Sequence, residues 1–122
     1  MRSDALTRTL GASGAVACSL AVALGAYAAH VAATQSQHRL GLAAVFLFGH
    51  GLALLALAPR AQSRLQRLAL SGLLLGMLLF SGSLSLAALF GMPTTLAPFG
   101  GSLLIIGWLV YAVAVLGETG AK

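Results

Sequence analysis

Two histidines and two serines in apolar surroundings are the residues of this sequence best suited to chemistry. His30 and His50 lie in the first and second apolar segments, and Ser81 and Ser83 lie in the third. Ionisable side chains within segments long enough to cross a membrane usually face the interior of a helical bundle, and they often belong to ion or proton pathways. These four residues are therefore the candidate intramembrane polar cluster.

The simplest role for this cluster is structural. Counting from the outer ends of the predicted helices places His50 roughly 15 Å deep, and Ser81 and Ser83 roughly 10–14 Å deep. A hydroxyl that donates to a neutral imidazole at that depth would contribute about 0.6–2 kcal/mol. His30, at about 5 Å, would lie nearer the outer surface. We therefore expect a hydrogen bond between His50 and one of the serines.

Two functional interpretations of the histidines stay open. A proton or solute pathway would use both histidines and both serines, although relays normally include carboxylates and the apolar segments contain none. Haem or metal ligation by His30 and His50 would need both rings at nearly the same depth, which the residue count does not favour. The sequence has one cysteine, Cys18, and lacks the HExxH, CxxC and GxSxG motifs and a phosphate-binding glycine loop. We predict no enzyme, no cofactor and no metal.

The composition indicates that most of the chain is surrounded by lipid. Of its 122 residues, 59% are hydrophobic and 7% are charged, and the mean hydropathy is +0.97. A soluble domain of this size could not cover so much apolar surface with so few charges. The net charge of +5 comes from basic residues at the ends of apolar segments. No basic face with interleaved aromatic residues is present, so we expect no nucleic-acid binding.

Four apolar segments are long enough to cross a hydrocarbon core of about 30 Å. They cover residues 10–33, 40–58, 68–90 and 99–116. Pro59 ends the second segment, and Gly91, Pro93 and Pro98 separate the third from the fourth. The predicted fold is all-α: one integral membrane domain over residues 1–122 that forms an antiparallel four-helix bundle.

The first apolar segment has a second interpretation. Arg2 and Arg8 precede it, and Ala26-Tyr27-Ala28 resembles the cleavage site of a secretory signal peptide. However, the segment is longer than the roughly 7–15 apolar residues of a signal peptide, and it is rich in Gly and Ala rather than Leu. We therefore expect it to remain in the protein as a membrane helix.

Small residues recur at helical spacing in two segments. They are Ala17, Ala21, Gly25 and Ala29 in the first segment, and Gly72 and Gly76 in the third. Such positions let two helix backbones approach closely in lipid. We predict that they pack helices, and that the chain is a structural or accessory membrane protein that associates with itself or with another membrane protein.

The basic residues predict an orientation. With four spans, both chain ends and the central loop share one side, and Arg39 alone lies on the other. The shared side holds Arg2, Arg8, Arg60, Arg64, Arg67 and Lys122. Because cytoplasmic loops carry the excess of Lys and Arg, we expect both termini in the cytoplasm and the chain in the bacterial inner membrane. Arg60, Arg64 and Arg67 would also attract anionic phospholipid, each by about 1 kcal/mol.

Five short motifs, in order, resemble one known family. They are Gly25-Ala26-Tyr27-Ala28-Ala29-His30, residues 50–57, Leu79-Phe80-Ser81-Gly82-Ser83-Leu84, Pro98-Phe99-Gly100-Gly101 and Gly107-Trp108. Their order and spacing are similar to the family catalogued as domain of unknown function 423, the YgdD-like bacterial inner-membrane proteins with mitochondrial relatives. The resemblance covers nearly the whole chain and implies a four-helix membrane protein with no assigned activity. Where that family has Gln and Tyr before the second-helix histidine, this chain has Val45-Phe46-Leu47-Phe48-Gly49.

Overall fold

The chain forms four long helices. A computed structural model describes residues 2–30 and 33–118. The helices are α1 (Arg2–Ala28), α2 (Thr34–Leu57), α3 (Arg64–Phe90) and α4 (Ala97–Glu118), and a short 3-10 helix, η1 (Ala58–Arg60), follows α2. Each of the four is long and apolar enough to cross a membrane. The predicted all-α fold is confirmed, and the described residues contain no strand.

The helix ends differ from the ends of the apolar segments. α1 ends at Ala28, five residues before the end of the predicted first segment, and α2 begins at Thr34, six residues before the second. α3 begins at Arg64 and so includes part of the polar loop. Hydropathy marks where hydrocarbon ends, whereas the backbone hydrogen bonds of a helix can continue into the polar layer.

The sequence around α3 fixes both of its ends. Ser63 is the N-cap residue, and its side chain accepts a hydrogen bond from the Gln66 amide at 3.1 Å. The Gln66 side-chain oxygen accepts in turn from the Ser63 amide at 3.2 Å, which completes a capping box. At the other end Gly91 has φ +69°, a left-handed conformation that glycine adopts without a Cβ penalty.

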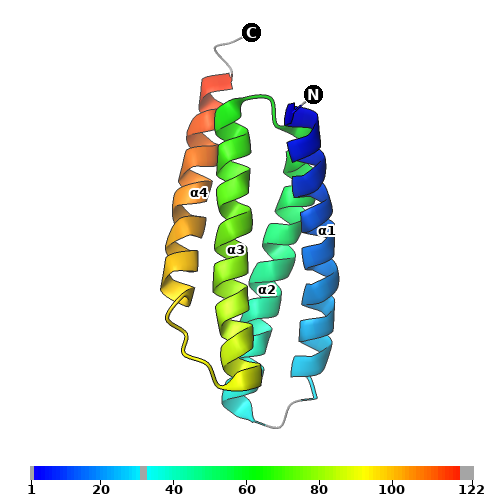
Figure 1. The fold of residues 1–122 in the computed structure, drawn as a ribbon, viewed down its shortest axis with the longest axis vertical. Helices are drawn as coiled ribbons and strands as arrows, with labels where there is room; N and C mark the ends of the chain where they lie inside the picture. Colours follow the sequence, from blue (N-terminus) through cyan, green and yellow to red (C-terminus); the bar gives the residue numbers. More distant parts are fainter. Residues whose placement is uncertain (1, 31–32, 119–122) are drawn as a thin grey trace.

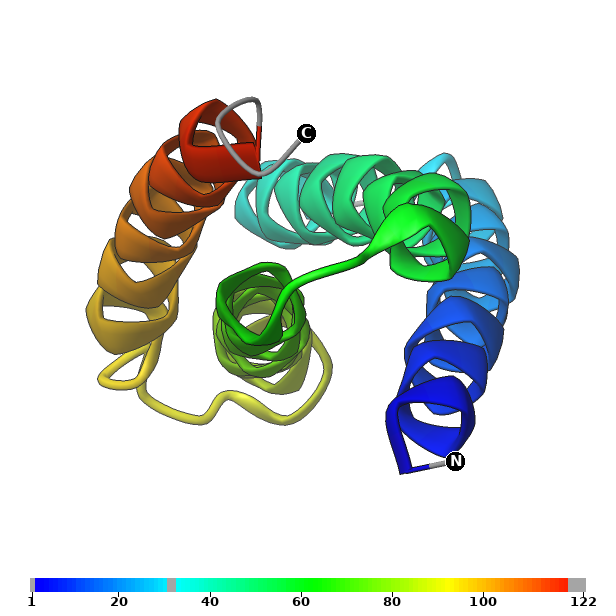
Figure 2. The same ribbon diagram turned by 90° about the horizontal axis from the view of Figure 1, so that it is seen from above.

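Successive helices alternate in direction (Figure 1). The start of α1, the α2–α3 connection and the end of α4 lie at one end of the molecule, and the other two connections lie at the opposite end (Figure 1). The closest neighbours are α1 with α2, α3 with α4, and α2 with α3. Viewed from above, α1 and α4 lie on opposite sides of α3 (Figure 2). The arrangement is therefore an open bundle, in which α1 does not close the ring against α4.

Two glycine pairs set the closest helix approaches. A Cβ added at Gly51 of α2 would lie 2.7 Å from the Gly14 carbonyl of α1. A Cβ added at Gly100 of α4 would lie 2.8 Å from the Gly76 carbonyl of α3. Real Cβ atoms do not approach backbone this closely, so only glycine permits these two helix contacts.

The six small residues predicted to pack helices have different surroundings. Ala17 and Ala21 are buried, and Gly76 meets α4. A Cβ on Gly25 would have only an ordinary contact at 3.9 Å, and one on Gly72 would meet nothing within 4 Å. Ala29 is exposed because α1 has already ended. The spacing of the small residues defines faces of a helix, but it does not identify which face a neighbouring helix covers.

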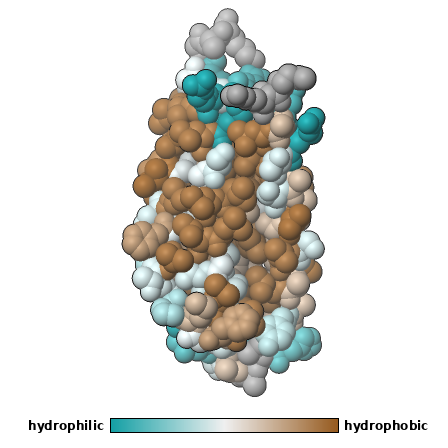
Figure 3. All heavy atoms as spheres, in the orientation of Figure 1, coloured by the Kyte–Doolittle hydropathy of each residue, from teal (hydrophilic) through white to brown (hydrophobic). Residues whose placement is uncertain are grey.

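Large apolar side chains cover much of the outer surface as well as the core. The core includes fully buried Leu40, Leu54, Leu70, Leu73 and Met77. In Figure 3, apolar residues cover the middle of the visible face, and hydrophilic residues gather at its two ends. An exterior of this kind suits a bilayer, whose hydrocarbon lies between two polar layers.

Candidate functional site

His50 of α2 has a hydrogen-bond partner for each ring nitrogen. Its Nδ1 lies 2.8 Å from the Phe46 carbonyl, and the Trp108 indole N–H donates to its Nε2 at 3.0 Å. An indole N–H can only donate, so Nε2 must accept and the ring proton must sit on Nδ1. From there it is donated to the Phe46 carbonyl. The geometry therefore fixes one tautomer of a neutral imidazole.

Aromatic rings from three helices surround this bond. Phe46 stacks on His50 with centroids 5.8 Å apart, and it contacts Phe80 of α3 at 4.6 Å. On α4, Trp108 meets Tyr111 edge to face at 6.3 Å. This aromatic cluster links α2 and α4, which are not close neighbours along their lengths.

The chemistry open to His50 is limited by these contacts. Neither ring nitrogen could ligate a metal or carry a relayed proton without losing a present partner. Across residues 2–30 and 33–118, no group of three or more His, Cys, Asp or Glu side chains could hold a metal ion. The arrangement is suited to joining helices.

Ser81 does not bond His50. Its hydroxyl donates to the Ala43 carbonyl at 2.9 Å, and Ala43 lies seven residues before His50, about 10 Å along α2. The expected serine–imidazole bond is therefore wrong. Ala43 lies nine residues from the true start of α2, and Ser81 lies nine residues from the end of α3. The prediction counted depth in the second helix from Leu40, whereas α2 begins at Thr34, so the predicted alignment of α2 with α3 was wrong by six residues.

The candidate polar cluster is spread over the molecule. Ser83 is buried in α3. His30 is exposed in the turn after α1, where its amide donates to the Tyr27 carbonyl at 3.0 Å. The helix break before His30 removes it from the apolar segment in which it was predicted. Among the described residues, no side-chain hydrogen bond joins any two of the four predicted residues.

Trp108 is the residue that the sequence analysis missed, because it appeared there only within the Gly107-Trp108 family motif. A usable signal was present: an indole N–H in apolar surroundings needs an acceptor, and His50 offers one in a chain with few polar groups.

The arginine-rich end holds a second polar arrangement. Gln66 is 2% exposed and donates through Nε2 to the Glu118 carboxylate, which joins the start of α3 to the end of α4. Beside this bond lies a hollow of about 600 Å³. Its lining is Leu57, Arg60, Gln62, Gln66, Tyr111, Val115 and Glu118.

The residues predicted to contact anionic lipid lie at this same end. Arg60 and Arg64 are exposed, and Arg67 is half-buried. Lys122, which the predicted charge asymmetry also counted, lies outside the described residues.

Four apolar helices joined by glycine contacts and internally bonded polar side chains define a small helical membrane protein. The family model described as protein of unknown function (DUF423) matches residues 24–101, and the chain belongs to that family. The predicted family resemblance is therefore confirmed.

Two bacterial relatives are named as membrane proteins. The chain is 35% identical over 99 residues to a UPF0382 membrane protein of Haemophilus influenzae. This alignment covers 75% of this chain and 80% of the relative. It is 34% identical over 109 residues to a UPF0382 membrane protein of Staphylococcus aureus. This alignment covers 83% of this chain and 89% of the relative. No solved structure matches the chain significantly.

Proposed function

We propose that this chain is a structural or accessory membrane protein that acts by associating, through the outer face of α1 and α2, with a second copy or another membrane protein. The observation that supports this is a shallow apolar hollow of about 540 Å³ on that face. It is lined by Ala21, Val22, Ala44, Val45, Phe48 and Gly49.

Two glycines of α2, the half-buried Gly41 and the exposed Gly49, have no close packing neighbour within the chain. Gly41, Val45 and Gly49 recur every four residues, and a Cβ added at either glycine would meet nothing within 4 Å. A glycine inside a helix costs about 1 kcal/mol relative to alanine. Close contact with the backbone of a partner helix would offset that cost, as in other membrane helix pairs.

We further propose that both termini and the arginine-rich end face the cytoplasm, and that the chain lies in the bacterial inner membrane. The support is the distribution of basic residues: Arg8, Arg60, Arg64 and Arg67 lie at one end and Arg39 at the other.

Gly49→Leu tests the association. The added side chain would enter open space in the free chain but would block a partner helix, so we expect the oligomer or partner complex to be lost. Gly82→Leu is the control. A Cβ at Gly82 also meets nothing within 4 Å, but Gly82 belongs to α3 and lies outside the proposed α1–α2 face, so this variant should keep the association. Blue-native electrophoresis and mass photometry of gently solubilised protein measure the outcome. A strictly monomeric wild type that co-purifies with no partner would disprove the proposal.

A further inference from the structure

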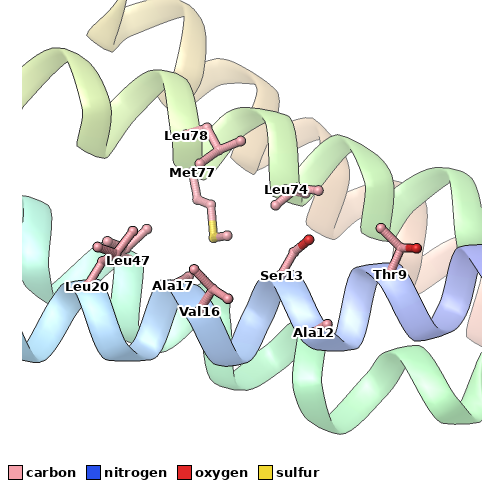
Figure 4. Close-up of a pocket in the computed structure, with 10 residues that line it drawn as sticks. All are labelled: Thr9, Ala12, Ser13, Val16, Ala17, Leu20, Leu47, Leu74, Met77 and Leu78. Atoms are coloured by element: carbon pink, nitrogen blue, oxygen red, sulfur yellow. The ribbon is translucent and has the colours of Figure 1, made fainter.

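An apolar groove separates α1 from α3. It has a volume of about 430 Å³, with α1 and α3 as its walls and Leu47 of α2 at its floor (Figure 4). The lining residues are Thr9, Ala12, Ser13, Val16, Ala17, Leu20, Leu47, Leu74, Met77 and Leu78. It exists because α1 and α3 both pack on α2 but contact each other little. An unfilled groove would forfeit the dispersion contacts of its lining.

The dimensions of the groove fit a hydrocarbon chain. On α1 the lining runs from Thr9 to Leu20, about 16 Å at 1.5 Å per residue. The groove is therefore elongated along the helix axis, with a volume of about 430 Å³. An acyl chain is a single row of methylene groups, much thinner than a helix of about 10 Å diameter, and it can lie along this groove over its full length.

One end of the groove is polar. In Figure 4 the Ser13 hydroxyl points into the groove, opposite Leu74. Among the described residues the Ser13 hydroxyl has no hydrogen-bond partner, whereas the Thr9 hydroxyl donates to the Ala5 carbonyl at 2.9 Å. A half-buried hydroxyl directed into apolar space is costly unless an acceptor meets it. The ester carbonyl of a glycerolipid is such an acceptor.

Arg67 lies beyond this polar end. It precedes Leu74 by seven residues on α3, so it lies on the same helix face and about 10 Å nearer the arginine-rich end. Its side chain is half-buried, and no carboxylate among the described residues pairs with it. A guanidinium in this position can bind a phosphate through two parallel hydrogen bonds.

We propose that the groove binds one acyl chain of an anionic glycerophospholipid, with Ser13 donating to an ester carbonyl and Arg67 binding the phosphate. The order of groups along the groove, cation then hydroxyl then apolar wall, matches the order of phosphate, ester and chain in the lipid. The site is formed by one copy of the chain and does not depend on the proposed association.

Native mass spectrometry of the full-length protein, released from detergent after incubation with phosphatidylglycerol or phosphatidylcholine, tests the site. We expect one retained phosphatidylglycerol per chain and less retained phosphatidylcholine. Val16→Trp fills the groove and should remove the retained lipid. Its control is Ile105→Trp on α4, since Val16 and Ile105 are 59% and 65% exposed. Ala12→Leu, also in the groove lining, is a second variant should Val16→Trp fail to fold.

The headgroup assignment has its own matched pair. Arg67→Gln should lower retention of phosphatidylglycerol roughly fivefold, the factor expected for one basic residue near an anionic lipid. Arg39→Gln removes the same charge from the opposite end of the helices, away from the groove, and it should retain the lipid.

Two results would overturn the lipid site. They are equal phosphatidylglycerol retention in wild type and Val16→Trp, whether or not a dimer is lost, and equal retention of the two lipids by wild type. The same spectra report chain mass, so failure of the lipid site is distinguishable from failure of the association.

Discussion

At the scale of single residues, the imidazole of His50 is held by one bond that it donates and one that it accepts. Trp108→Phe would leave Nε2 without a partner in apolar surroundings. We expect this variant to be destabilised by about 0.6–1.7 kcal/mol, the range for hydrogen bonds between membrane helices. Removing both partners, in Trp108→Phe with His50→Leu, should cost less than the two single changes together.

Thermal unfolding of the four proteins in one detergent measures this coupling. Ring ¹⁵N chemical shifts of His50 provide an independent check, since they report which nitrogen carries the proton. Strictly additive effects, or a proton on Nε2, would contradict the assignment of the bond.

The residue scale also shows what sequence could provide. The apolar context of His50 and Ser81 identified them as residues that need partners. The identity of each partner depended on register, and register depended on a helix start at Thr34 that hydropathy does not mark. Once that start is known, equal counts from the outer helix ends place Ser81 opposite Ala43, as observed.

At the scale of helices, glycines with similar sequence context differ in what surrounds them. Gly51→Ala would place a Cβ 2.7 Å from the Gly14 carbonyl and 3.0 Å from the Cys18 sulfur. Because backbone cannot yield cheaply, we expect a loss of about 1–3 kcal/mol of stability. Gly72→Ala enters open space and should gain up to about 1 kcal/mol from helix propensity.

Unfolding midpoints of the two alanine variants, measured side by side in the same detergent, give the comparison. A Gly72→Ala protein that is as unstable as Gly51→Ala would show that α3 packs differently. The GxxxG spacing predicted that both Gly72 and Gly76 pack against another helix, because a spacing defines one helix face but not the neighbour that covers it.

At the scale of the whole molecule, four long apolar helices could be predicted, because apolar segments of about 20 residues are typical of helices that cross a bilayer. The openness of the bundle could not, since it depends on which side chains meet between α1 and α3. The position of α1 relative to α3 follows from the close approach of Gly14 and Gly51, which packs α1 against α2. The resulting groove is a property of the assembled helices, and no single segment contains a signal for it.

The distribution of charge over the molecule yields a prediction about orientation. Arg60, Arg64 and Arg67 supply half of the six basic residues assigned to the cytoplasmic side, against Arg39 alone on the other. Replacing these three with Gln should weaken the bias that keeps short loops in the cytoplasm, so that a measurable fraction of chains inserts inverted. Alkaline phosphatase and green fluorescent protein fusions at the C-terminus report the two orientations. Arg39→Gln is the control, because it strengthens the same bias and should leave the C-terminus cytoplasmic. A periplasmic C-terminus in the wild type would reverse the assignment of both faces, and with it the leaflet from which a phospholipid could reach Arg67.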